Sequence, residues 1–178
     1  MTDVFGAEFL DRLHSVGAVK NPASFEALRT QGFPNRRVEA WRYTDLAGQL
    51  AQTLTPAGLR INQEQSGLFG PNPAVQTVEG DALSLMNAAV GGEGFLFEVP
   101  EGARLKPVFA RFGPMAANAL VNATNRITIG AGAQAVLVER WGQTDESWMN
   151  SDTTIDVAEG GHLRRIILVE DGGAGTQT

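Results

Sequence analysis

Cysteine is absent from this chain of 178 residues, and histidine occurs only twice. Without thiols the chain can form no disulfide, offer no thiolate nucleophile and supply no cysteine ligand to zinc or to an iron–sulfur cluster. A metal site would need carboxylates grouped around His14 or His162. The sequence therefore excludes thiol enzymes and cysteine-ligated metalloproteins.

Long apolar runs and an excess of positive charge are also missing. No stretch approaches the ~20 apolar residues that a membrane-spanning helix needs, and the first residues, MTDVFGAEF, include acids where a signal peptide has basic residues. The 20 acidic residues outnumber the 14 basic ones, which gives a net charge of −6 and argues against nucleic acid as the main partner. We therefore expect a soluble, cytoplasmic protein that binds neither membrane nor nucleic acid.

The first part of the chain, residues 1–55, carries helical patterns. Apolar residues recur at every fourth position between Thr2 and Val19, a spacing typical of an amphipathic helix. A second helix is predicted to begin at Pro22, which suits a first helical turn, and to stop at Gly32. Residues 56–94 contain many glycine, proline and polar residues, and we interpret them as a connecting segment with a short strand and a helix.

From residue 95 to 171 the pattern changes to short alternating runs typical of strands, and these runs recur. Three segments each read as strand, turn and strand, with Gly102, Gly132 or Gly160 at the equivalent place in the turn. A unit of two short strands cannot bury its apolar face alone, whereas stacked units bury a continuous column. We predict a mainly β protein with an N-terminal helical part, in which 95–171 forms a parallel β-helix (β-solenoid) that is cut short, followed by a flexible tail at 172–178. The alternative is a twisted sandwich of antiparallel strands.

The segment GFPNRRVEAWRYTDL concentrates charge and aromatic rings in fifteen residues. In a binding interpretation, Arg36 and Arg37 clamp an anion while Trp41 and Tyr43 stack on a base or a sugar. In a structural interpretation, Trp41 fills the gap between the helices and the strands, and the two acids of the segment pair with its arginines. The nearly balanced charge favours the structural interpretation, because a paired arginine binds an external anion poorly.

The same segment resembles the N-terminal signature of the SufD proteins of the SUF iron–sulfur cluster assembly system, G-[LF]-P-x-[RK]-[RK]-x-E-x-W-[RK]-Y-T-x-L. The matching residues, to which we assign a structural role, are Gly32, Pro34, Arg36, Arg37, Glu39, Trp41, Tyr43, Thr44 and Leu46. The likeness continues at VPEGARLKP, which is similar to the start of the family's β-helix, and at ITIGAGAQAVLVE, which is similar to the following repeat.

This resemblance implies a non-enzymatic scaffold subunit that acts with a SufB-like protein and a SufC-like ATPase. It also implies an N-terminal helical domain, a central right-handed parallel β-helix and a C-terminal helical domain, and the chain matches only the first half of that plan. The iron–sulfur cluster would belong to the complex, so we assign this chain no cofactor, no metal ligand and no catalytic residue. A homodimer is a further expectation, since an open last repeat leaves an unpaired sheet edge.

Three residues of the last repeat are candidates for contact with a partner: His162, Arg164 and Arg165. His162 follows the glycine turn, and we expect it to be exposed. Arg164 and Arg165 are adjacent on a predicted strand, so one should face solvent and the other a neighbouring repeat or subunit.

Two other classes of function stay open. One is a β-helix enzyme acting on acidic polysaccharide, which needs carboxylates and basic residues stacked on one strand face. The outward positions that the repeats predict show no such column: Glu98, Thr128, Glu139 and Asp156. The other is an anion-binding module that uses Arg36 and Arg37.

Overall fold

The computed structural model describes residues 4–34, 46–63, 67–72, 79–142, 146–170 and 176–177. Strands make up 47% of the structure and helices 23%. The helices are α1 (Val4–Ser15), α2 (Pro22–Gln31), α3 (Ala47–Leu50) and α4 (Ala82–Val90). The strands are β1 (Thr55–Ala57), β2 (Leu59–Gln63), β3 (Phe69–Asn72), β4 (Gly92–Val99), β5 (Val108–Pro114), β6 (Ala119–Ile129), β7 (Gln134–Gly142), β8 (Trp148–Val157), β9 (His162–Glu170) and β10 (Thr176–Gln177).

The helices begin and end at residues whose chemistry favours those positions. Pro22 opens α2, and the Asn21 side chain accepts a hydrogen bond from the backbone N–H of Ser24. Gly32 ends the helix with a φ of +73°, a conformation that glycine adopts at little cost. The helix predicted between Pro22 and Gly32 is therefore confirmed. Asp81 caps α4 in the same way as Asn21, by accepting from the N–H of Ser84 at 2.8 Å.

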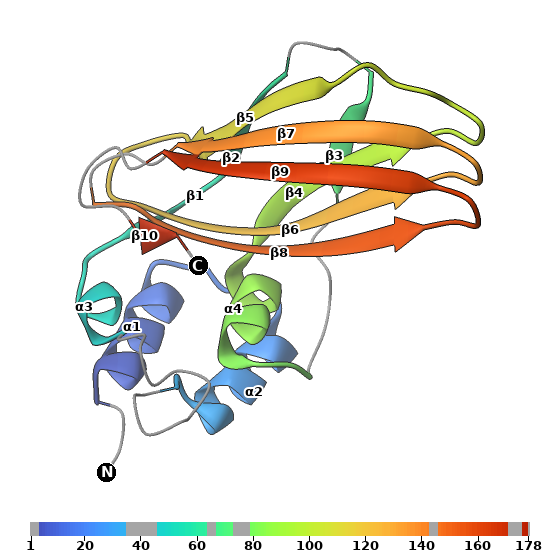
Figure 1. The fold of residues 1–178 in the computed structure, drawn as a ribbon. Helices are drawn as coiled ribbons and strands as arrows, with labels where there is room; N and C mark the ends of the chain where they lie inside the picture. Colours follow the sequence, from blue (N-terminus) through green and yellow to red (C-terminus); the bar gives the residue numbers. More distant parts are fainter. Residues whose placement is uncertain are drawn as a thin grey trace.

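Two mixed sheets lie against each other above the helices (Figure 1). The first has the order β10-β8-β6-β4-β3, with β1 paired to β6, and the second has the order β2-β5-β7-β9. The chain alternates between them, so β4, β6 and β8 are parallel in one sheet while β5, β7 and β9 are parallel in the other. At one edge of each sheet the neighbour is antiparallel: β3 pairs with β4, and β2 pairs with β5.

The predicted parallel β-helix is wrong. The repeat itself is present, and Gly102, Gly132 and Gly160 each occupy a turn with φ between +64° and +68°. However, β2 and β3 reverse direction at the edge, which makes both sheets mixed and rules out a solenoid. These two strands are short and lie in the segment 56–94, where glycine and proline hide the alternating pattern. Only pairing with distant strands defines them.

Two apolar cores follow from this arrangement. One lies between the sheets and includes Phe95, Phe97 and Ile127. The other lies between the helices and the outer face of the first sheet, where Leu120 and Trp148 are register partners on β6 and β8. Because these strands bury side chains on both faces in this region, they hold the helical layer and the sandwich together.

A buried asparagine strengthens that junction. Asn150 of β8 donates from Nδ2 to the carbonyl oxygen of Leu83 at 2.9 Å and to Oδ1 of Asn87 at 3.0 Å, both in α4. It also reaches Oδ1 of Asn122 on β6 at 3.2 Å. A polar side chain is tolerated inside the junction because its donors find acceptors there.

Candidate docking surface at the open end of the sandwich

One edge of the sandwich is covered by the antiparallel strands β2 and β3. The ring of Phe69 on β3 lies 5.0 Å from Phe97, 5.7 Å from Phe95 and 6.3 Å from Phe112, measured between centroids. Ile61 on β2 is half-buried against the same core. We call this edge the closed end.

The opposite edge is formed by β8 and β9, and we call it the open end. In the part of the chain that the structure describes, no strand lies beyond β9. Beyond β8 lies only the two-residue β10, which pairs with Trp148 and Met149. The backbone N–H and C=O groups on the outer side of residues 151–157 and 162–170 thus have no described strand beside them. Such an edge is a template for pairing with another strand.

Apolar side chains that are register partners on successive strands form columns through the core. These columns continue to the open end, where their last side chains are not covered. In each column the residues of successive strands are register partners, and the first two members are almost fully buried. Three such columns are Phe97–Ile127–Ile155, Val99–Ile129–Val157 and Phe112–Trp141–Val169. The last members are 43%, 47% and 59% exposed, respectively.

Ile167, which follows Ala110 and Glu139 in a fourth column, is 46% exposed. The cross-section of the core is therefore accessible at this end. An apolar patch beside unpaired backbone is typical of a protein-binding site.

A buried ion pair lies just inside this surface. Glu139 of β7 is fully buried, and its carboxylate accepts from Nε of Arg165 at 2.6 Å and from Nη2 at 3.0 Å. Nε1 of Trp141 donates to the same carboxylate at 2.8 Å. The bidentate pair and the indole together satisfy a charge that would otherwise be costly inside the core. Arg165 also lies 3.5 Å from Oγ1 of Thr153 on β8, so the network spans both sheets.

The burial of Glu139 corrects a prediction. We expected this residue on the outer face with Glu98, Thr128 and Asp156, yet it points into the core. The signal was present in the sequence, because Glu139 has the same strand parity as the apolar Leu137 and Trp141. The partner that makes burial tolerable, Arg165, lies in a different strand and could not be found from local pattern.

The predicted contact residues of the last repeat separate as the strand alternates. Arg164 is exposed on the outer face of β9, whereas the Arg165 side chain points inward and is 21% exposed. His162 is exposed at the start of the strand, and its backbone N–H donates to the carbonyl of Ala133. All three residues lie on β9, and Arg165 is the one whose side chain points toward the core at the open end.

Most of the SufD-like motif falls outside the described residues, namely Arg36, Arg37, Glu39, Trp41, Tyr43 and Thr44. The ends of the segment are described. Phe33 and Leu46 are buried in the core between the helices and the first sheet, and the Phe33 ring makes an edge contact with Phe9 at 5.9 Å. Pro34 is half-buried, and Gly32 ends α2. Both ends of the segment are thus anchored between helices and strands.

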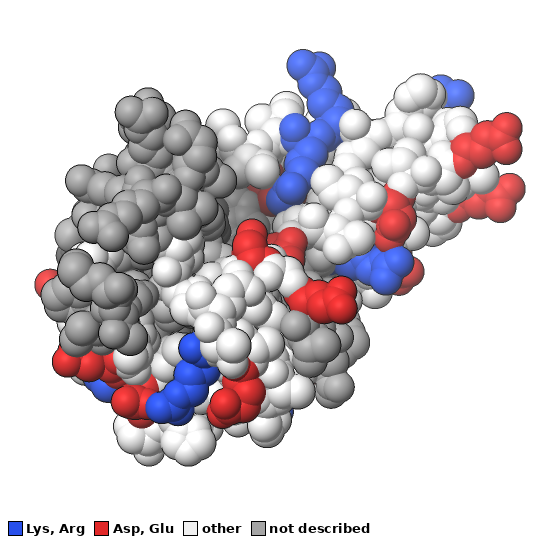
Figure 2. Space-filling view, turned by 90° about the horizontal axis from the view of Figure 1, so that it is seen from below, with Lys and Arg blue, Asp and Glu red and all other residues white. Residues whose placement is uncertain are grey.

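On the helical side, the described residues show neither a patch of one charge nor a group of metal ligands. Seen from there, acidic and basic side chains are interspersed among uncharged ones (Figure 2). Within the described ranges, no three His, Asp or Glu side chains are grouped closely enough to hold a metal ion. None of the described helices combines the length and the apolar character needed to cross a bilayer.

Comparison of the chain with models of known protein families, with curated proteins and with solved structures found no match. The features of this chain that bear on function are thus the geometry of the open end and the motif at residues 32–46.

Proposed function

We propose that the chain is a scaffold subunit without catalytic activity that binds another protein through the open end of its sandwich. The observation that carries the proposal is that the core columns end in four half-exposed side chains, Ile155, Val157, Ile167 and Val169. They lie on residues 151–157 of β8 and on β9, along which no described strand is paired at the outer edge. The occupant is a β-rich protein that adds strands to β8 and β9 and covers these side chains. β-Augmentation of this kind takes its affinity from main-chain hydrogen bonds and its specificity from alternate side chains.

The energetics support such docking. Full burial of one valine or isoleucine contributes ~1.5–3 kcal/mol. The four side chains are about half-exposed, so covering them contributes on the order of 3–6 kcal/mol before the costs of association. The Glu139–Arg165 ion pair places a charged group in this apolar surface. A partner has to present a compatible side chain there, which restricts which proteins can bind.

We further propose that the chain is SufD-like and acts in the cytoplasm within a SUF iron–sulfur cluster assembly complex. The motif from Gly32 to Leu46 supports this identity. We propose a SufB-like subunit as the occupant of the open end, a SufC-like ATPase as the third component, and an iron–sulfur cluster that belongs to the assembled complex. Mixed sheets depart from the parallel β-helix that the resemblance implies, so the proposal does not depend on that fold.

The test is co-expression of the chain with the SufB-like and SufC-like proteins of the same organism, followed by native mass spectrometry. We expect a defined complex for the wild-type chain and its loss in Val169→Lys. The matched control is Val16→Lys, which places the same charge on another exposed valine, 66% accessible and close to α1. No complex with the wild-type chain would overturn the family assignment. Equal binding by Val169→Lys would show that the partner docks elsewhere.

A further inference from the structure

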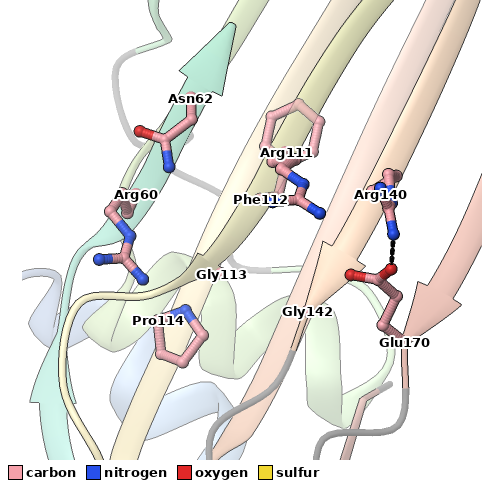
Figure 3. A pocket seen from close by; sticks show the side chains of 9 residues that line it. All are labelled: Arg60, Asn62, Arg111, Phe112, Gly113, Pro114, Arg140, Gly142 and Glu170. Atoms are coloured by element: carbon pink, nitrogen blue, oxygen red, sulfur yellow. Dashed lines mark hydrogen bonds and ion pairs between the residues drawn. The ribbon is translucent and has the colours of Figure 1, made fainter.

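We infer that the outer face of the second sheet carries a binding site for a small phosphate-bearing ligand, distinct from the open end. The site is a hollow of about 180 Å³ over the first half of the sheet, lined by side chains from β2, β5, β7 and β9. It brings together Arg60, Arg111 and Arg140 with one acid, Glu170 (Figure 3). In a chain with a net charge of −6, three arginines around one hollow form a local region of opposite sign.

The register of the sheet explains how the hollow forms. One row across the strands reads Asn62, Arg111 and Arg140, since Asn62 pairs with Arg111 and Arg111 pairs with Arg140. In the next row Arg60 pairs with Gly113, and Gly142 pairs with Glu170. Gly113 and Gly142 have the same parity as the outward-pointing Arg111 and Arg140. The two glycines therefore leave a floor without side chains between the charged residues.

Most of the positive charge in the hollow is uncompensated. Arg140 forms an ion pair with Glu170. Arg60 and Arg111 are exposed, and their side chains make no hydrogen bond or ion pair with any residue in the described ranges. Arg60 is a diagonal neighbour of Arg111, because Asn62, two residues further along β2, is the register partner of Arg111. Diagonal neighbours on one face of a sheet lie roughly 7–8 Å apart, so the two guanidinium groups repel each other. An anion between them would remove that repulsion.

Arg140 also has a donor that its ion pair with Glu170 leaves unsatisfied. Its Nε is buried but has no hydrogen-bond partner, although its Nη2 reaches Glu170. Buried donors in folded proteins are normally satisfied, and an exception calls for a ligand or a water molecule. An oxyanion in the hollow would accept from the exposed guanidinium groups of Arg60 and Arg111. It would reach the Nε–H of Arg140 only after that side chain turns toward the hollow, because this nitrogen has almost no accessible surface.

The size and the donors of the hollow favour phosphate. The hollow, about 180 Å³, is large enough to receive a phosphate or pyrophosphate group. Planar guanidinium forks bind the oxygens of phosphate in pairs, and the Asn62 amide adds a neutral donor at the rim. We therefore assign the site to inorganic phosphate, pyrophosphate or a small molecule that carries such a group.

The experiment is calorimetric titration of the purified chain with sodium pyrophosphate at fixed ionic strength. In Arg111→Gln we expect the dissociation constant to rise about ten- to a hundredfold, because a charged bidentate contact is lost. The matched control is Arg164→Gln, which removes an equally exposed arginine from the outer face of β9, outside the hollow. Its dissociation constant should change less than about twofold, since a distant exposed charge is screened by salt.

Two further arms make the result decisive. Glu170→Gln removes the acid beside the site, so pyrophosphate should bind several-fold more tightly; weaker binding would contradict the assignment.

Malonate tests a dicarboxylate of similar charge, and tighter binding of malonate than of pyrophosphate would overturn phosphate as the ligand. No measurable binding by the wild-type chain, or equal loss in Arg111→Gln and Arg164→Gln, would overturn the site itself. None of these outcomes bears on docking at the open end, which the native mass spectrometry tests separately.

Discussion

The two ends of the sandwich differ in how the same apolar columns are completed. At the closed end, Phe69 of β3 and the antiparallel strand β2 cover the first members of the columns. At the open end, the last members remain about half-exposed beside β8 and β9. Stacked repeats therefore bury a core only between repeats, and each terminal repeat needs a cover of a different kind.

The largest expected effect comes from breaking the ion pair inside the open end. Arg165→Ala leaves the buried carboxylate of Glu139 without its charged partner, so we expect a loss of ~3–5 kcal/mol in the free energy of unfolding. Chemical denaturation followed by tryptophan fluorescence measures it. The double variant Glu139→Gln with Arg165→Met removes both charges and should recover much of the loss. If the single variant is as stable as the wild type, Glu139 is not buried in solution.

The column that contains Ile127 and Ile155 allows the same substitution at a buried and at a half-exposed position. Ile127 is fully buried, whereas its register partner Ile155 is 43% exposed. We expect Ile127→Ala to cost ~2–5 kcal/mol in the free energy of unfolding because it leaves a cavity. Ile155→Ala should cost less than about 1 kcal/mol, since much of its side chain is already in water. Urea denaturation of both variants measures the difference, and equal losses would mean that the open end is covered in the isolated chain.

The junction between the helices and the sandwich should respond less strongly. Asn150→Ala removes the donor shared by the Leu83 carbonyl and by Asn87, and we expect a loss of ~1–3 kcal/mol in the free energy of unfolding. Thr154→Ala on the same strand, at an exposed position, is the control and should change it by less than about 0.5 kcal/mol. A thermal melt of each variant separates the two, and matching melting temperatures would show that these hydrogen bonds add little.

The smallest effect on stability belongs to the substitution designed to block docking. Val169→Lys lies at the exposed end of a column, so the free energy of unfolding should change by less than ~0.5 kcal/mol. Phe112→Lys places the same charge at the buried start of that column and should prevent folding. Circular dichroism distinguishes these outcomes. Unfolding of Val169→Lys would mean that its loss of partner binding says nothing about the interface.

Local chemistry allowed parts of this fold to be predicted. Pro22 and Gly32 set the limits of α2, and the recurring turn glycines marked the strand–turn–strand units. The parallel β-helix was wrong because β2 and β3 have weak patterns, and their antiparallel pairing depends on strands far away in the sequence. Much of the candidate site could not be predicted from the sequence. An uncovered last repeat predicts exposed strand ends. The ion pair between Glu139 and Arg165 joins two different strands, so no local pattern indicates it.

The helix limits, the strand periodicity, the repeat and the absence of thiol chemistry follow from the sequence alone, because they depend on residue type and on the spacing of a few positions. Which edge of the sandwich is closed and which is open depends instead on how distant strands pair. The grouping of Arg60, Arg111 and Arg140 around one hollow also depends on the tertiary structure, since strand register places residues from three separate strands side by side. Register arises from long-range packing of buried faces, which no local pattern contains.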